Sequence, residues 1–140
     1  MEFRILTSKD KEEAVALAVQ LEPDTYTVEM LNPLFDEMFA HDGHRAFGVF
    51  EEGTMVGWST GWLSTRFYCG RQLELDNVVT DANRRSQGIG KFLVEKILEW
   101  CVENKLDAVE LNAYIPNKRA HSFYENLGFN PVGIHFQKKL

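Results

Sequence analysis

Residues 78–91 constrain the fold of this 140-residue chain more than any other segment. A run with the alternating pattern of a β-strand ends near Thr80, and a loop with two arginines and two glycines follows it. That loop leads directly into a helix predicted over residues 89–102, because the apolar residues there recur with the helical period. Another strand is predicted over residues 108–115, so the helix crosses between two parallel neighbours in the right-handed sense. We therefore predict an α/β protein with a mixed sheet and helices on its faces.

In the rest of the sequence, apolar residues recur with either the helical or the strand period, which predicts short helices and strands. The sequence has no repeat, low-complexity stretch or linker. Pro23 ends the first helix, and Pro33 lies inside the second, where it predicts a late start or a kink. Gly128 ends the last helix. These further elements are predicted, in chain order, as a strand over 3–6, helices over 8–21 and 27–41, strands over 46–51, 55–64 and 71–80, a helix over 117–127 and a strand over 134–138.

Length and composition exclude several classes of protein. A chain of 140 residues can bury a core without disulfides, and we expect a single domain over residues 1–140. Fifteen basic against 21 acidic residues give a net charge of −6, which repels a phosphate backbone and predicts no nucleic-acid partner. No apolar run approaches the roughly 18 residues of a membrane span, and residues 1–4 lack the layout of a secretory signal. Cys69 and Cys101 form neither a disulfide framework nor a metal cluster, so we expect a soluble, cytoplasmic protein without a metal.

The loop of residues 81–91 has the chemistry of an anion-binding site. The first amide groups of a helix have no internal partners, and the helix dipole adds positive potential there. Glycines allow an anion to approach these amides closely, and Arg84, Arg85 and Lys91 add positive charge, although Arg84 fits an exposed loop position better. A phosphate-binding P-loop would need Ser or Thr at Phe92, and a dinucleotide-binding fingerprint would need Gly or Ala at Leu93. Physical chemistry alone therefore predicts a pyrophosphate cradle of a different kind.

Two blocks of residues resemble the signatures of the GNAT superfamily of N-acetyltransferases. The first is Arg85-x-x-Gly88-x-Gly90, which is similar to the acyl-CoA signature of that superfamily. The second block lies at residues 117–129 and combines an Asn, an Ala, a Phe-Tyr pair and a Gly-Phe pair. Both blocks occur in the right order on the predicted elements, and the resemblance covers roughly residues 46–138.

The resemblance implies a GNAT-like, mostly antiparallel sheet that splays beside Val78, with the pantetheine arm of acetyl-CoA in the gap. The backbone of Val78, Val79 and Thr80 would pair with that arm, and the amide of Val78 or Val79 would polarise the thioester carbonyl. Asn117 would bind the pantetheine arm or order the splayed strand, and it also suits a helix cap. The residues implied for the diphosphate are Arg85, Ser86, Gln87, Gly88, Ile89, Gly90 and Lys91.

Acyl transfer to an amine also needs proton acceptors and donors, because most aliphatic amines are protonated at neutral pH. Strand alternation places Glu74 and Asp76 on one face together with Val78 and Thr80. The resemblance implies Asp76 as the base or the amine anchor, with Glu74 as the second choice; the alternative is that both are solvated charges on a sheet face. It also implies that Tyr124 protonates the leaving thiolate, whereas packing beside Phe123 is the plainer alternative.

The resemblance implies acetyl transfer from acetyl-CoA to a primary amine by direct transfer in a ternary complex. Acidic and aromatic residues in the segments that would wall the acceptor site suit a small cationic metabolite. The alternative is that these acids form only a solvated helix face. His41 and His44 flank a loop that could border this site, with nothing to distinguish them from ordinary surface residues. The alternatives are a protein or peptide N-acetyltransferase and a non-catalytic acyl-CoA-binding module. The predicted strand over residues 134–138 could also pair across a homodimer.

Overall fold

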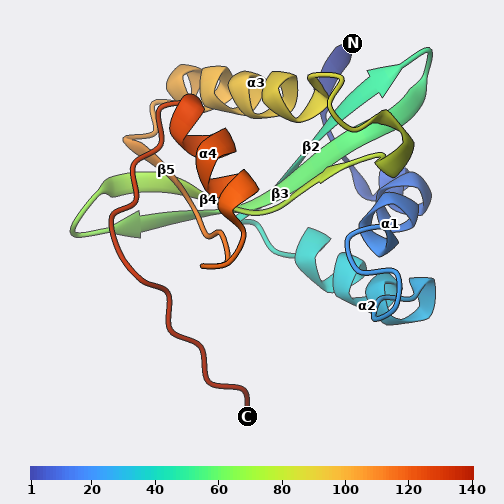
Figure 1. Ribbon diagram of the computed structural model, residues 1–140, viewed down its shortest axis with the longest axis horizontal. Helices are drawn as coiled ribbons and strands as arrows, with labels where there is room; N and C mark the ends of the chain where they lie inside the picture. Colours follow the sequence, from blue (N-terminus) through green and yellow to red (C-terminus); the bar gives the residue numbers. More distant parts are fainter. The chain divides into compact units, whose positions relative to one another are not determined.

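Five of the six predicted strands form one sheet, and helices flank it (Figure 1). The computed structural model of the protein describes residues 1–140. Its five strands lie in the order β1-β2-β3-β4-β5, and the first four pair antiparallel in succession. The elements are β1 (Glu2–Ile5), α1 (Lys11–Val19), α2 (Val28–Phe39), β2 (His44–Glu51), β3 (Thr54–Arg66), β4 (Gly70–Thr80), α3 (Ile89–Glu103), β5 (Ala108–Leu111) and α4 (Lys118–Asn126), with short 3-10 turns at Ser8–Asp10 and Ala82–Arg84. This architecture confirms the predicted fold class.

Contacts divide the chain into two compact units, Met1–Glu110 and Leu111–Leu140. The first unit holds α1, α2, α3 and almost all of the sheet, and the second holds α4 and the C-terminal residues. The expectation of a single domain over residues 1–140 stays a prediction.

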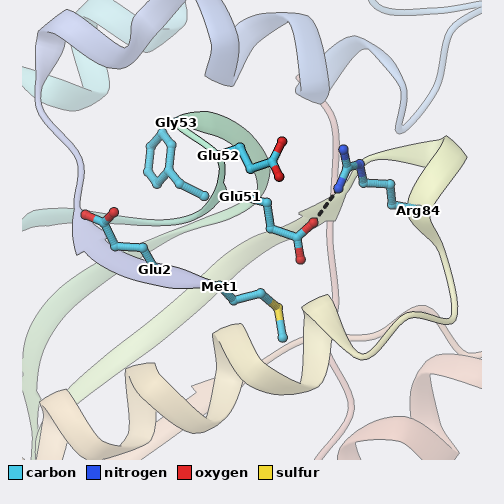
Figure 2. A pocket seen from close by; sticks show the side chains of 7 residues that line it. Met1, Glu2, Glu51, Glu52, Gly53 and Arg84 are labelled. Carbon is cyan, nitrogen blue, oxygen red and sulfur yellow. Dashed lines mark hydrogen bonds and ion pairs between the residues drawn. The ribbon is translucent and has the colours of Figure 1, made fainter.

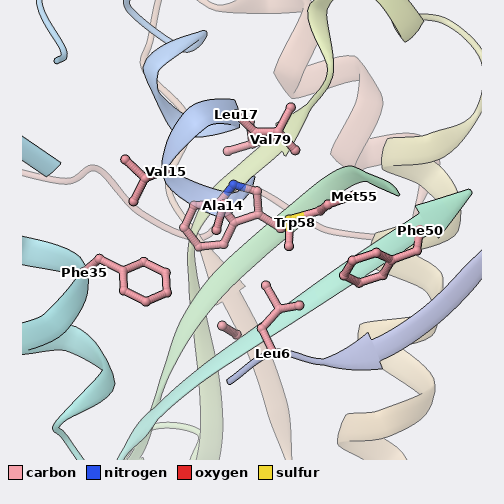
Figure 3. Packing of buried hydrophobic residues seen from close by; sticks show 10 residues of the cluster. Leu6, Ala14, Val15, Leu17, Phe35, Phe50, Met55, Trp58 and Val79 are labelled. Atoms are coloured by element: carbon pink, nitrogen blue, oxygen red, sulfur yellow. The ribbon is translucent and has the colours of Figure 1, made fainter. Parts of the chain in front are cut away.

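One face of the sheet is covered by α1 and α2, and the apolar side chains between them form a core cluster (Figure 3). Figure 3 shows Phe35 of α2 and Val15 of α1 on the same side of β3 as Trp58. The ring centroids of Phe35 and Trp58 lie 6.4 Å apart. The cluster comprises Leu6, Ala14, Val15, Leu17, Phe35, Ala46, Phe50, Met55, Trp58 and Val79. Each large side chain buried in this way contributes about 1.5–3 kcal/mol of transfer free energy.

The opposite face of the sheet carries α3, which Figure 1 shows on the other side from α1 and α2. Phe47 of β2 meets Trp100 of α3, with ring centroids 5.1 Å apart. The buried stripe of α3 follows the predicted helical period and consists of Ile89, Leu93, Val94, Ile97 and Cys101. A glycine at position 57 allows the start of α3 to approach β3, since a Cβ there would lie 2.9 Å from Cγ2 of Ile89.

A β-bulge in β4 changes which residues share a face. Val78 lies opposite Ser59 and Leu75 opposite Gly61, so two residues of β4, Asp76 and Asn77, face the single residue Thr60. Both bulge residues are exposed. Directly opposed residues share a face, so the bulge moves Val78 to the α3 face.

The bulge corrects part of the predicted alternation. Glu74 is opposed to Trp62, and Asp76 hydrogen-bonds that indole, so the two carboxylates share a face as predicted. Val78 and Thr80 are not on that face: Thr80 is opposed to Gly57 beside α3, and Val79 instead packs in the cluster with Trp58. Alternation failed here because one extra residue reverses the side-chain pattern beyond it.

Two strand predictions near the C-terminus are also corrected. The fifth strand ends at Leu111 rather than at residue 115. Residues 134–138 form no strand, and no helix or strand lies beyond Asn126. Apolar alternation fits a strand, but a strand forms only where a neighbour completes its hydrogen-bond ladder. The homodimer contact expected through this segment stays a prediction without the strand that suggested it.

Candidate active site

The loop that follows β4 is fixed at its base by contacts from three elements. The amide of Asp81 donates to the carbonyl of Val56 at 3.0 Å, and the amide of Ala82 donates to Oε1 of Gln20 at 2.8 Å. The guanidinium of Arg84 forms an ion pair with Glu51. These contacts bind residues 81–84 to neighbouring parts of the structure, so they fix the direction in which the loop leaves β4.

A hollow of about 600 Å³ lies beside this ion pair and is distinct from the glycine-rich part of the loop. Figure 2 shows Arg84 reaching Glu51 across it, with the carboxylates of Glu2 and Glu52 nearby. Three carboxylates disfavour a phosphate group here. Arg84, which was expected to be an exposed loop charge, is partly buried and forms an ion pair with Glu51. Arg85 is the exposed arginine of the loop.

The glycine-rich part of the loop presents open backbone to solvent. Residues 85–88 are exposed, and Gly88 has a left-handed backbone with φ of +82°. Apart from adjacent residues of the chain, no atom lies within 4 Å of the position that a Cβ of Gly88 would occupy. Ser86 is also left-handed, with φ of +65°, a conformation that is uncommon for a residue with a side chain. Two residues with left-handed backbone, Ser86 and Gly88, thus shape the loop, and the backbone at Gly88 is open to an approaching ligand.

The start of α3 provides amide donors at this opening. The hydrogen bond from the amide of Phe92 to the carbonyl of Gly88 is 2.9 Å long. The amides of Ile89, Gly90 and Lys91 precede it, and such amides have no partner within a helix. Ile89 is buried and fixes the helix to the sheet, whereas the ammonium of Lys91 lies 3.8 Å from Glu95 on the exposed surface. The geometry is that of an anion-binding helix N-terminus.

The predicted carboxylates lie on β4, at and before the bulge. Asp76 is exposed, and its Oδ2 accepts a hydrogen bond of 2.7 Å from the indole Nε1 of Trp62. Glu74 is partly buried and opposite Trp62 in the strand register. The structure therefore brings the two carboxylates together around one aromatic side chain.

The two remaining predicted site residues belong to the second unit. Asn117 caps α4, with its Oδ1 accepting from the amide of Ala120 at 3.1 Å. Tyr124 is partly buried, its ring edge-on to those of Phe123 at 5.0 Å and Phe129 at 5.8 Å. Burial raises the pKa of the Tyr124 phenol, so it is protonated at neutral pH. The capping role and the aromatic packing are both present, and the roles toward a coenzyme stay predictions.

Sequence reasoning missed how closely Trp62 and His44 are connected to Asp76. The rings of His44 and Trp62 lie 5.0 Å apart, and His44 is buried with no hydrogen-bond partner for its Nε2. Burial lowers the pKa of His44 to about 4. The pattern of residues 46–64 predicted a hairpin, but only the register of the two strands brings these side chains together.

Comparison with known proteins identifies the family. The model of the "Acetyltransferase (GNAT) family" matches residues 11–129. The chain therefore belongs to the GNAT acetyltransferase family, as the two sequence blocks predicted.

Known proteins resemble this chain in sequence or in fold. "Uncharacterized N-acetyltransferase YhdJ" of Bacillus subtilis is 24% identical over 123 residues, which are 87% of this chain and 83% of that protein. "N-acetylaspartate synthetase" of Xenopus tropicalis is 37% identical over 62 residues, which are 44% of this chain but only 23% of the synthetase. The aminoglycoside N-acetyltransferase AAC(6')-Iy, solved in complex with CoA, superposes with a TM-score of 0.83 at 17% identity, covering 99% of this chain and 93% of that one.

None of the helices has both the length and the apolar composition needed to cross a bilayer. No group of three or more His, Cys, Asp or Glu side chains is arranged to hold a metal ion.

Proposed function

We propose that the protein transfers the acetyl group of acetyl-CoA to a primary amine, and that the amine is a small cationic metabolite. The observation that carries the proposal is the open, left-handed Gly88 at the start of α3, at the end of the loop that follows the bulged strand β4. Membership of the GNAT acetyltransferase family supports the reaction class. The acceptor is inferred from the charges and aromatic rings of this chain.

The residues of the loop fit the diphosphate of the coenzyme. The amides of Ile89, Gly90 and Lys91 can donate to phosphate oxygens, and the missing side chain of Gly88 leaves room for them. Arg85 and Lys91 are exposed beside these amides and add positive charge. Ser86 and Gln87 are exposed in the same loop, and we propose that they line the coenzyme as well. When bound, acetyl-CoA supplies the activated acetyl group as a thioester.

The strand before the loop would position the reactive end of the coenzyme. We propose that the backbone of Val78, Val79 and Thr80 pairs with the pantetheine arm. Val78, Val79 and Thr80 are paired with β3 along one edge, so the arm would pair with their opposite edge. An amide of Val78 or Val79 would then donate to the thioester carbonyl oxygen.

The acceptor amine is assigned to the face of β4 that carries the carboxylates. Asp76 is exposed next to Trp62, with Glu74 one strand step away. A carboxylate attracts an ammonium group by charge, and an indole face attracts it by cation–π interaction. This combination favours a compact cation such as a polyamine or an amino sugar over a neutral acceptor.

Tyr124 and Asn117 complete the proposal through the family motif. The pKa of Tyr124 is raised by burial, so its phenol carries the proton that a leaving thiolate needs. Asn117 caps α4, the helix that carries Tyr124, and we propose that it binds the pantetheine arm in addition.

The proposed reaction is tested by measuring thiol release from acetyl-CoA with a panel of polyamines, amino sugars, amino acids and peptides. Product mass identifies the acetylated compound, and reactions without amine are the control. We expect turnover with small cationic amines. Turnover with peptides alone would make the metabolite assignment wrong and leave the reaction standing. Coenzyme binding without thiol release for any amine would instead identify a non-catalytic acyl-CoA-binding module.

A further inference from the structure

Both residues of the β4 bulge are tied to side chains of the neighbouring strand. Asp76 accepts through Oδ2 from the indole of Trp62 at 2.7 Å, and Nδ2 of Asn77 donates to Oγ1 of Thr60 at 3.3 Å. Thr60 and Trp62 are two residues apart on β3, so they present side chains to the same face. The bulge is thus held by two hydrogen bonds from one strand, and the direction of the Asp76 carboxylate is set by the first of them.

The indole of Trp62 is itself fixed by aromatic neighbours. Its ring lies edge-on to His44 at 5.0 Å and to His41 at 5.5 Å. His44 is buried and also packs on Phe39, with ring centroids 4.9 Å apart. Because burial lowers the pKa of His44 to about 4, this ring is neutral at pH 7 and does not compete with a cation. Trp62 is therefore held by two ring contacts as well as by its hydrogen bond to Asp76.

We infer that Trp62 is the positioning residue for Asp76 in acceptor binding, an inference that rests on the proposed function. The bond from Nε1 of Trp62 occupies Oδ2 of Asp76. Oδ1 is left to accept a hydrogen bond from the ammonium group of the acceptor. Selectivity for a cationic amine is then set by a pair of residues from two strands.

Replacing Trp62 by Phe tests this arrangement, because the variant keeps an aromatic ring against His44 and loses the N–H donor. We expect the KM for the accepted amine to rise about tenfold, as for loss of a hydrogen bond to a charged group, with CoA affinity unchanged. Asp76→Asn should raise the same KM, and the double variant should be no worse than Asp76→Asn, because both changes remove one interaction. Trp100→Phe makes the same replacement on α3 and should leave the KM unchanged.

A spectroscopic readout separates positioning from simple packing. The chain has three tryptophans and therefore three indole N–H signals in a nitrogen-15 NMR spectrum. We expect the Trp62 signal, assigned from the Trp62→Phe variant, to move on addition of the amine and in Asp76→Ala, while the Trp100 signal stays in place.

The outcomes separate this inference from the proposed function. A wild-type protein that turns over no amine would overturn both. A wild-type protein that turns over an amine, with an unchanged KM in Trp62→Phe or fully multiplicative effects in the double variant, would overturn the role of Trp62 alone. A Trp62 indole signal that moves neither on addition of the amine nor in Asp76→Ala would also overturn the role of Trp62.

Discussion

His44 shows how a single buried side chain can make stability depend on pH. Its Nε2 has no hydrogen-bond partner, and its pKa lies near 4 instead of the ordinary 6.5 because the ring is removed from water. The folded protein therefore resists protonation of His44, whereas the unfolded chain accepts the proton readily. Sequence alone could not reveal this, because a histidine at the start of a strand is equally compatible with either environment.

The free energy of unfolding should fall as the pH is lowered through the window between 6.5 and 4. Above pH 6.5 His44 is neutral in both states; below it, only the unfolded chain gains the proton. From pH 7 to pH 5 the loss due to this residue is about 2 kcal/mol. Urea unfolding of the wild type and His44→Gln at both pH values measures it, since other groups cancel in the difference. An identical pH dependence in the two proteins would contradict the assigned environment of His44.

At the scale of elements, local pattern predicted most of what the structure contains. The helix over residues 89–102 and the hairpin around Gly53 agree with the structure, because apolar periodicity and turn residues act within a few positions. The bulge at Asp76 was not predictable, since it depends on how β4 aligns with β3. The strand expected over residues 134–138 failed for a similar reason: its pattern permits a strand, but pairing decides whether one forms.

Gly57 links the sheet to the loop that we propose binds the diphosphate. A Cβ at this position would lie 2.9 Å from the side chain of Ile89 and 3.1 Å from the carbonyl oxygen of Val79. Gly57→Ala should therefore destabilise the protein by about 1–3 kcal/mol, as overpacking does, and weaken CoA binding by displacing the start of α3. Chemical unfolding and calorimetry measure the two effects.

Gly133→Ala is the matched control, because no atom lies within 4 Å of the added carbon. That variant should stay within about 0.5 kcal/mol of the wild type. Wild-type stability in Gly57→Ala would show that α3 does not depend on close approach to β3.

At the scale of the whole molecule, the family assignment and the loop proposed to bind the diphosphate rest on different observations. The family model spans residues 11–129 and includes parts of both compact units. The loop lies entirely within the first unit, where its shape follows from backbone conformation and from the packing of Ile89. Motif spacing predicted this loop correctly as the turn between β4 and α3. The roles of Asn117 and Tyr124 toward the coenzyme remain predictions, because motif position identifies residues without fixing where their side chains reach.

The central claim is that the amides at the start of α3 hold the diphosphate of the coenzyme, and calorimetric titration of CoA into Gly88→Glu tests it most directly. The matched variant is Gly53→Glu, which adds the same charge at another open, left-handed glycine, with φ of +79°. We predict that Gly88→Glu loses at least about a hundredfold in affinity, since a like charge meets the phosphates, while Gly53→Glu binds CoA like the wild type. Wild-type affinity in Gly88→Glu, or an equal loss in both variants, would contradict the account.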